Sequence, residues 1–185
     1  MEMIQFYKPN PKVTGTACSF WVNKDGSIMT SMIKQDSWNE AKKQGSFLKN
    51  KDNPQKKVVS KLSRIEIAGI IDSIERNVEF KNFHSSQNQV LQIKFCPYLD
   101  KETQAQKGFS FSINKQNKED STQKTGFIIG FSYPEARLLK HDLENFLTSS
   151  THAAEQPAQS SNEFTTAPKP SETKTQDEDG SLDSW

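Results

Sequence analysis

The sequence predicts an α+β protein built from two tandem units, each of four strands followed by a helix, with a disordered acidic tail. Three observations carry this prediction: a strand that leads into a capped amphipathic helix at 125–147, the same pattern at 58–77, and a sharp change in composition after residue 149. A pattern used twice indicates a repeated fold. We therefore expect one domain over 1–149, with units at about 1–77 and 78–149, and a tail over 150–185.

The segment 125–147 is the clearest element. It opens with an apolar run rich in Phe and Ile, which is typical of a buried strand. Ser132 and Glu135 then form a capping box, in which the serine hydroxyl accepts from a free helix amide and the carboxylate accepts from the serine's own amide. An apolar stripe at helical spacing follows, formed by Ala136, Leu139, Leu143, Phe146 and Leu147.

The same pattern occurs once before, 69 residues earlier when measured between the two cap serines. Val58 and Val59 lead to Ser63, and Glu66 stands three residues beyond it. The helical stripe that follows has matching offsets and consists of Ile67, Ile70, Ile71 and Ile74.

The strands of the first unit are indicated by alternation and by turn residues. Segment 1–13 predicts an edge strand or an extended arm, because its prolines remove ladder donors. Strand 16–22 places Cys18, Phe20 and Val22 on one face and Trp21 on the other, and Asn-Lys-Asp-Gly at 23–26 predicts a hairpin. The expected strands that follow are Ile28–Ile33, a short third strand near Ser46–Leu48, and Val58–Leu62.

The second unit repeats this order with polar loops between its strands. Its expected strands are Val78–Phe83, Val90–Phe95, Phe109–Asn114 and Thr125–Phe131. A five-stranded barrel of the OB type is the rival fold, but a second capped helix at the end of the domain fits it poorly.

Charge is distributed unevenly along the chain. Residues 151–185 carry two lysines and seven acidic residues, a net charge of −5, so the first 150 residues carry +6. The hydrophobic content of 32% and mean hydropathy of −0.80 also predict that part of the chain is disordered. A basic body with an acidic tail favours a nucleic-acid binder with a regulatory arm.

Other functional classes have little support. The sequence has no Gly-rich phosphate loop and no His/Cys set at metal-ligand spacing, so we expect neither an enzyme nor a cofactor or metal site. No stretch is apolar enough for a signal peptide or a membrane span, which favours a cytoplasmic protein. Cys18 and Cys96 are expected to be reduced strand residues, with a disulfide between equivalent strands as the alternative.

Lysines interleaved with aromatic residues are what a single-strand binder needs, because lysines neutralise phosphates and aromatic faces stack on bases. The lysine-rich stretch 42–61 is either a phosphate-tracking loop or a solvated one. The candidates in the first unit are Phe6, Tyr7, Lys8, Lys12, Phe20, Trp21, Lys34, Trp38, Lys42, Lys43, Lys56 and Lys57. Those in the second unit are Phe80, Lys81, Phe83, Lys94, Tyr98 and Lys115.

The tail has a possible role of its own. A tethered polyanion competes with nucleic acid for a basic groove, and its displacement frees the tip for partner proteins. A solubilising tail is the alternative. The residues expected to bind partners are Asp177, Glu178, Asp179, Leu182, Asp183 and Trp185.

The doubled order of four strands and a helix resembles the Whirly single-stranded-DNA-binding proteins, and it is similar to the transcriptional positive-cofactor-four fold. The resemblance covers about residues 1–149 and rests on KVTGTACSF at 12–20, GFSFSINKQ at 108–116 and the segment 125–147. It implies antiparallel sheets, DNA bound across sheet surfaces near Lys12, Phe20, Trp21 and Lys34, and a homo-oligomer assembled through the helices. Thr14 and Cys18 depart from the family's pattern.

The acidic C-terminus with its final aromatic residue resembles the tails of bacterial and bacteriophage single-strand-binding proteins. The combination suggests a bacteriophage-type protein that protects single-stranded DNA in replication, recombination and repair and recruits replication or recombination proteins. An RNA-binding or annealing protein, and a transcription-cofactor module that binds protein, are the alternatives of the same fold.

Overall fold

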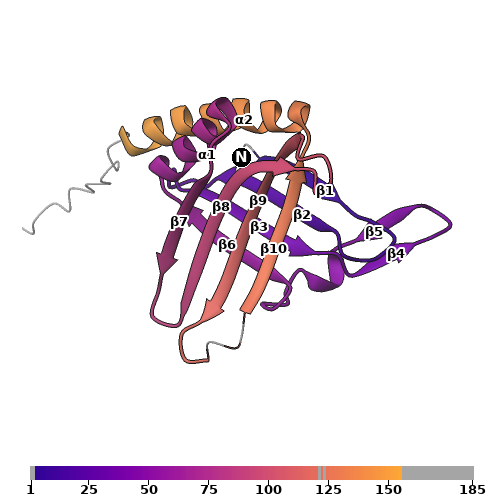
Figure 1. Ribbon diagram of the computed structural model, residues 1–185. Helices are drawn as coiled ribbons and strands as arrows, with labels where there is room; N and C mark the ends of the chain where they lie inside the picture. The colour runs from indigo at the N-terminus through magenta and orange to yellow at the C-terminus, as the bar shows by residue number, and fades with distance from the viewer. Residues whose placement is uncertain (1–2, 121, 123, 156–185) are drawn as a thin grey trace, which may run out of the picture.

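The computed structural model describes residues 3–120, 122 and 124–155, with side chains as far as residue 150. These residues form two four-stranded antiparallel sheets, a small two-stranded sheet and two α-helices (Figure 1). The predicted order of four strands and a helix, twice over, is therefore observed. The second helix continues to Glu155, so the first residues of the predicted tail are helical.

The first sheet contains the N-terminal segment as a full edge strand, with the strand order β1-β2-β3-β6. The predicted hairpin at 23–26 is present: Gly26, at φ 75°, donates its amide to the carbonyl of Asn23 at 3.0 Å. The strands are β1 (Met3–Lys8), β2 (Thr16–Val22), β3 (Ile28–Lys34) and β6 (Lys57–Leu62).

The third strand expected near 46–48 is wrong as a member of this sheet. That region forms a separate hairpin, β4 (Ser37–Asn39) and β5 (Gln44–Ser46), which extends away from the body and is followed by a short 3₁₀ helix, η1 (Leu48–Asn50) (Figure 1). The side chain of the buried Gln35 connects the start of this hairpin to the loop after β1. Its oxygen accepts from the amides of Asn10 and Gly15, and its nitrogen donates to the carbonyls of Asn10 and Ser37.

The second sheet has the order β7-β8-β9-β10, and its two central strands are longer than expected. The strands are β7 (Phe80–Ser85), β8 (Gln89–Leu99), β9 (Gln106–Asn117) and β10 (Lys124–Phe131). The β8–β9 register shifts between Tyr98 and Leu99.

The two sheets pack face to face, with their strands crossing at a large angle (Figure 1). Rings from the two sheets meet directly: Phe20 lies 5.4 Å from Phe111, and Phe6 lies 4.9 Å edge-on to Phe131. Aromatic pairs at such separations add to the free energy gained by burying apolar area. These contacts determine which side of each strand belongs to the core.

Both helices begin at the predicted cap serines and lie side by side across one end of the sandwich (Figure 1). Helix α1 (Arg64–Arg76) has the complete capping box, and α2 runs from Tyr133 to Glu155. The apolar stripes are buried or half-buried as predicted. The two cysteines are free, which excludes the alternative disulfide between them, and burial raises the pKa of the Cys18 thiol to about 12.

Each cap glutamate also contacts the first strand of the other unit. Glu66, which is 2% exposed, accepts hydrogen bonds from Asn82 at 2.9 Å and contacts Nε2 of His84 at 2.6 Å, both on β7. Glu135 accepts from the amide of Ser132 at 2.8 Å and forms an ion pair with Lys8 on β1. The two units are thus joined by reciprocal contacts at their helix N-termini.

Burial on its own raises the pKa of Glu66, but the hydrogen bonds from Ser63, Asn82 and His84 outweigh it and lower the pKa below 4.5. The folded pKa of Glu135 is lowered in the same way, against burial, mainly by Lys8 and Ser132. A carboxyl group whose folded pKa is depressed contributes stability above its unfolded pKa, and that stability is lost as the pH falls.

We expect Glu66→Gln to lower the free energy of unfolding at pH 7 by about 1–3 kcal/mol, because buried donors lose a charged acceptor. The difference from wild type should shrink as the pH falls through the lowered pKa of the folded carboxyl, where the wild-type side chain also becomes protonated. Urea unfolding at pH 7 and pH 3.5 measures both effects, with the exposed loop variant Glu102→Gln as the control. A difference that is equal at the two pH values would contradict the role of the charge.

Candidate nucleic-acid interface

Because the inner faces of the two sheets form the core, a ligand can reach the sheets only at their outer faces and edges. The strand register defines rows of side chains across each outer face. One row joins Tyr7, Ala17, Ile33 and Lys57 across the first sheet. Lys57 stands six residues before the cap serine of α1.

The residue six positions before the second cap serine is Gly126, and its row joins Phe83, Gln92, Asn114 and Gly126. Tyr7 and Phe83 therefore occupy equivalent positions, each on the first strand of its sheet. Both side chains are 56% exposed. The next residue on each strand is Lys8 in the first unit and His84 in the second, so these two are also equivalent. Lys8 contacts the cap residue Glu135, and His84 contacts the cap residue Glu66.

The outer face of the first sheet has an aromatic side and a basic side. Tyr7 on β1 lies 5.9 Å from Phe47, ring to ring, and Trp21 is half-buried on β2 with its indole N–H donated to Asn23. Lys57 and Lys61 stand on β6 at the opposite edge. Small side chains, Ala17, Ser19 and Ser31, form the floor between the two sides.

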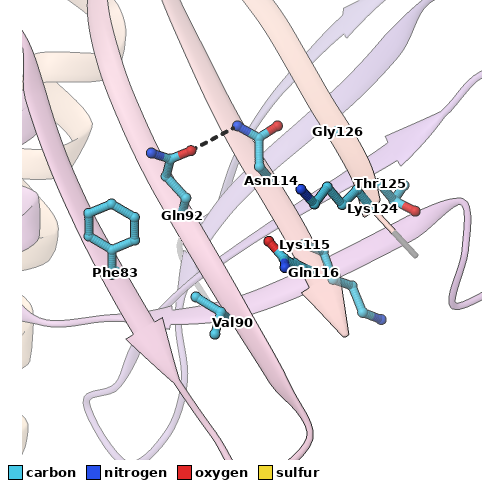
Figure 2. A pocket seen from close by; sticks show the side chains of 9 residues that line it. All are labelled: Phe83, Val90, Gln92, Asn114, Lys115, Gln116, Lys124, Thr125 and Gly126. Atoms are coloured by element: carbon cyan, nitrogen blue, oxygen red, sulfur yellow. Dashed lines mark hydrogen bonds between the residues drawn. The ribbon is translucent and has the colours of Figure 1, made fainter. Parts of the chain in front are cut away.

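The outer face of the second sheet is hollowed. A depression of about 320 Å³ lies over the row of Phe83, and Gly126 leaves it open because it has no side chain (Figure 2). Asn114 donates to Gln92 at 3.3 Å on its floor. The residues that line it are Phe83, Val90, Gln92, Asn114, Lys115, Gln116, Lys124, Thr125 and Gly126.

Several lysines line this hollow or lie near its aromatic ring. Lys124 belongs to its lining, and the ammonium of Lys81 lies 5.2 Å from the centre of the Phe83 ring. Lys94 is paired with Glu79 at 2.6 Å, which raises the pKa of that lysine. Tyr98, also predicted as a binder, is half-exposed further along β8.

The remaining predicted lysines lie around the hairpin and at the edge between the sheets. Lys34 lies 5.2 Å from the ring of Phe127, and burial lowers its pKa, as does the charge of Lys56. Lys115 donates to the carbonyl of Pro54 at 3.5 Å. Trp38 and Lys43 both contact Glu40 within the hairpin, whereas Lys12, Lys42 and Lys56 are exposed.

Three of the predicted contacts need correction. Phe6 and Phe20 are 6% and 0% exposed, so neither ring can stack on a base. The ring of Phe80 packs inward against Gly69 of α1, where an added Cβ would lie 2.3 Å from the ring. Lys8 is paired with Glu135 but keeps 40% of its side chain exposed, so its contact with nucleic acid stays a prediction. The placement of Phe20 near DNA, which the family resemblance implied, is therefore wrong for this structure.

Several residues of the two faces were missed by the sequence reasoning. Phe47 and Lys61 complete the first face, and Gln92, Asn114 and Gly126 form the hollow of the second. The alternation of apolar and polar residues along 89–117 would have assigned the side-chain amides of Gln92 and Asn114 to the outer face. The position of Gly126 opposite Asn114 depends on register, which the sequence does not state.

A serine, a histidine and a glutamate lie together between the sheets. Ser60 Oγ is 3.2 Å from Nδ1 of His84, whose Nε2 contacts Glu66. The order resembles a hydrolase triad, but Ser60 is 5% exposed, so a substrate cannot reach its hydroxyl. The cluster therefore joins structural elements rather than forming an accessible nucleophilic site.

Two further classes of site were sought within residues 3–120, 122 and 124–155. No group of three or more His, Cys, Asp or Glu side chains there is arranged to hold a metal ion. Neither described helix is long and apolar enough to cross a bilayer. The predicted partner-binding residues from Asp177 to Trp185 lie outside the described part of the chain.

Comparison with solved structures shows what this arrangement is similar to. WHY3 from Arabidopsis thaliana superposes with a TM-score of 0.59 at 15% identity, covering 83% of this chain and 90% of that one. The chain has the Whirly fold. The plant transcriptional regulator PBF-2 gives a TM-score of 0.57 at 18% identity, over 83% and 85% of the two chains. MRP1/MRP2 of trypanosoma bruciei gives 0.52 at 13% identity, over 82% and 87%.

The Whirly fold confirms the architecture that the resemblance implied. No protein-family model and no curated protein matches the sequence. At these identities the likeness to the Whirly structures establishes the fold, while the ligand must be argued from the two outer faces. Self-association through the helices stays a prediction.

Proposed function

We propose that this protein binds single-stranded DNA with little overall sequence preference, through the outer faces of its two sheets. The observation that carries the proposal is the recurrence of a half-exposed aromatic residue, Tyr7 and Phe83, at equivalent positions of the two sheets. A single exposed ring is ordinary on a protein surface, but a ring that recurs with the fold's internal repeat supports a shared use of the two positions.

The chemistry of both faces suits a single strand. Aromatic faces stack on bases of any sequence, and lysines neutralise the phosphates. Four strands span about 14 Å from the aromatic edge to the lysine edge of the first face, which accommodates one strand with its bases and phosphates on opposite sides. A duplex would present neither its base faces nor a matching width.

We infer a role in protecting single-stranded DNA during replication, recombination or repair, in a protein of bacteriophage type. The basic body and the acidic tip from Asp177 to Trp185 support the further proposal that the tip competes with DNA and recruits replication or recombination proteins. RNA binding or annealing, and a transcription-cofactor module that binds protein, are the alternatives; PBF-2 is a plant transcriptional regulator. A titration with matched DNA, RNA and duplex ligands separates them.

Tyr7→Ala and Phe83→Ala should each raise the Kd for oligo-dT about 5- to 100-fold, because each removes a stacking platform. Fluorescence anisotropy with labelled oligo-dT measures the effect. Tyr133→Ala is the matched control, since this ring is exposed to a similar extent on α2. Unchanged affinity in both face variants would refute base stacking at these positions.

The affinity for oligo-dT should fall as salt rises, by about 0.7 log units per log unit of salt for each phosphate contacted. Lys57→Ala with Lys61→Ala should reduce that slope by about 1.4, because two contacts are removed. Lys101→Ala, in the exposed β8–β9 loop, should leave the slope unchanged. A slope near zero in the wild-type protein would exclude phosphate-driven binding.

Deletion of residues 177–185 should tighten binding to oligo-dT at low salt and abolish recruitment of replication or recombination proteins. The gain should vanish at high salt, where a tethered polyanion no longer competes. Trp185→Ala, which keeps every acidic residue, separates the two roles: it should reduce recruitment without changing DNA affinity. A deletion that changes neither property would favour a solubilising tail.

A further inference from the structure

The hollow on the second sheet differs from the first face in one respect: it offers hydrogen-bonding groups beside the aromatic ring. The side-chain amides of Gln92 and Asn114 stand opposite each other on β8 and β9, in the same row as Phe83 (Figure 2). The first face has Ala17 and Ile33 at the corresponding positions. Within this row the second face thus places two side-chain amides between its outer strands, where the first face has apolar side chains.

The two amides are available to a ligand. Asn114 is exposed, and its bond to Gln92, at 3.3 Å, is long and lies at the surface, so it is easily exchanged. A Cβ at position 126 would lie 3.0 Å from Oδ1 of Asn114. Glycine at this position therefore avoids a close contact with the amide. A depression of about 320 Å³ beside a half-exposed ring accommodates a purine with part of its sugar.

We infer that this hollow is a nucleobase pocket that prefers adenine, a specificity that rests on the proposed binding of single strands. The base stacks against Phe83 while an amide pairs with its edge. An amide presents one donor beside one acceptor, and adenine offers it two matching edges, N6 beside N7 and N6 beside N1. Cytosine offers one such edge, N4 beside N3, and stacks a smaller ring on Phe83. Lys124, at the rim, is placed to bind the adjoining phosphate.

The proposal changes what is expected of binding. Most contacts remain indifferent to sequence, and one position per protein selects a base. Oligo-dT in which every fourth base is replaced by dA should bind about two- to fivefold more tightly than the same oligonucleotide carrying dC, since the purine stacks over a larger area and offers the amide two edges rather than one.

Gly126→Val is the decisive variant, because a branched side chain fills the hollow and displaces the flexible amide of Asn114. It should abolish the preference for dA over dC. Gly130→Val is the matched control: it lies on the same strand and face, outside the hollow, where the nearest atom to an added Cβ is 3.9 Å away. Asn114→Ala provides a second variant that keeps the hollow open, and it should reduce the preference for dA over dC.

Each outcome of these titrations is informative. A preference that survives Gly126→Val, or equal binding of the dA, dC and dG oligonucleotides by the wild-type protein, would overturn the pocket and leave non-specific binding intact. Preference for dG would overturn the assignment to adenine. Failure of the wild-type protein to bind any single strand would refute the proposed function, and the pocket with it.

Discussion

The reciprocal contacts of the two cap glutamates determine how the rest of the molecule is arranged. Glu66 completes a capping box with Ser63, and Glu135 accepts from the amide and hydroxyl of Ser132. Each also contacts the first strand of the other unit, through His84 and Lys8. A capping box is a local device, worth about 1 kcal/mol in a helix. Here it also fixes the relative placement of two sheets that share no strand, so the helix N-termini connect local and tertiary structure.

With the sheets in this arrangement, whether an aromatic side chain is buried or exposed depends on which side of its strand it occupies. The neighbours Phe6 and Tyr7 differ completely: the first packs on Phe131 in the core, and the second is half-exposed. Phe80 and Phe83 divide in the same way on β7. Core packing and the candidate interface thus use the same strands, on alternating residues.

Local signals explain what could be predicted from the sequence. The cap serines, the helical stripes and the hairpin at 23–26 depend on neighbours within a few residues, and all were found. The hairpin β4–β5 was missed because Gln35 and Gly45 define it through contacts with Asn10 and Pro9, far away in the chain. The ion pair of Lys8 could not be foreseen for the same reason, since Glu135 lies 127 residues beyond it.

The equivalence of Lys57 and Gly126 has a consequence for how the molecule treats a polymer. Where one unit carries a lysine, the other carries an open pocket and two amides. Two identical subunits related by a twofold axis would offer the same chemistry in either direction. Two unlike units in one chain do not, so a polynucleotide that passes from one to the other would be bound in a preferred 5′-to-3′ orientation.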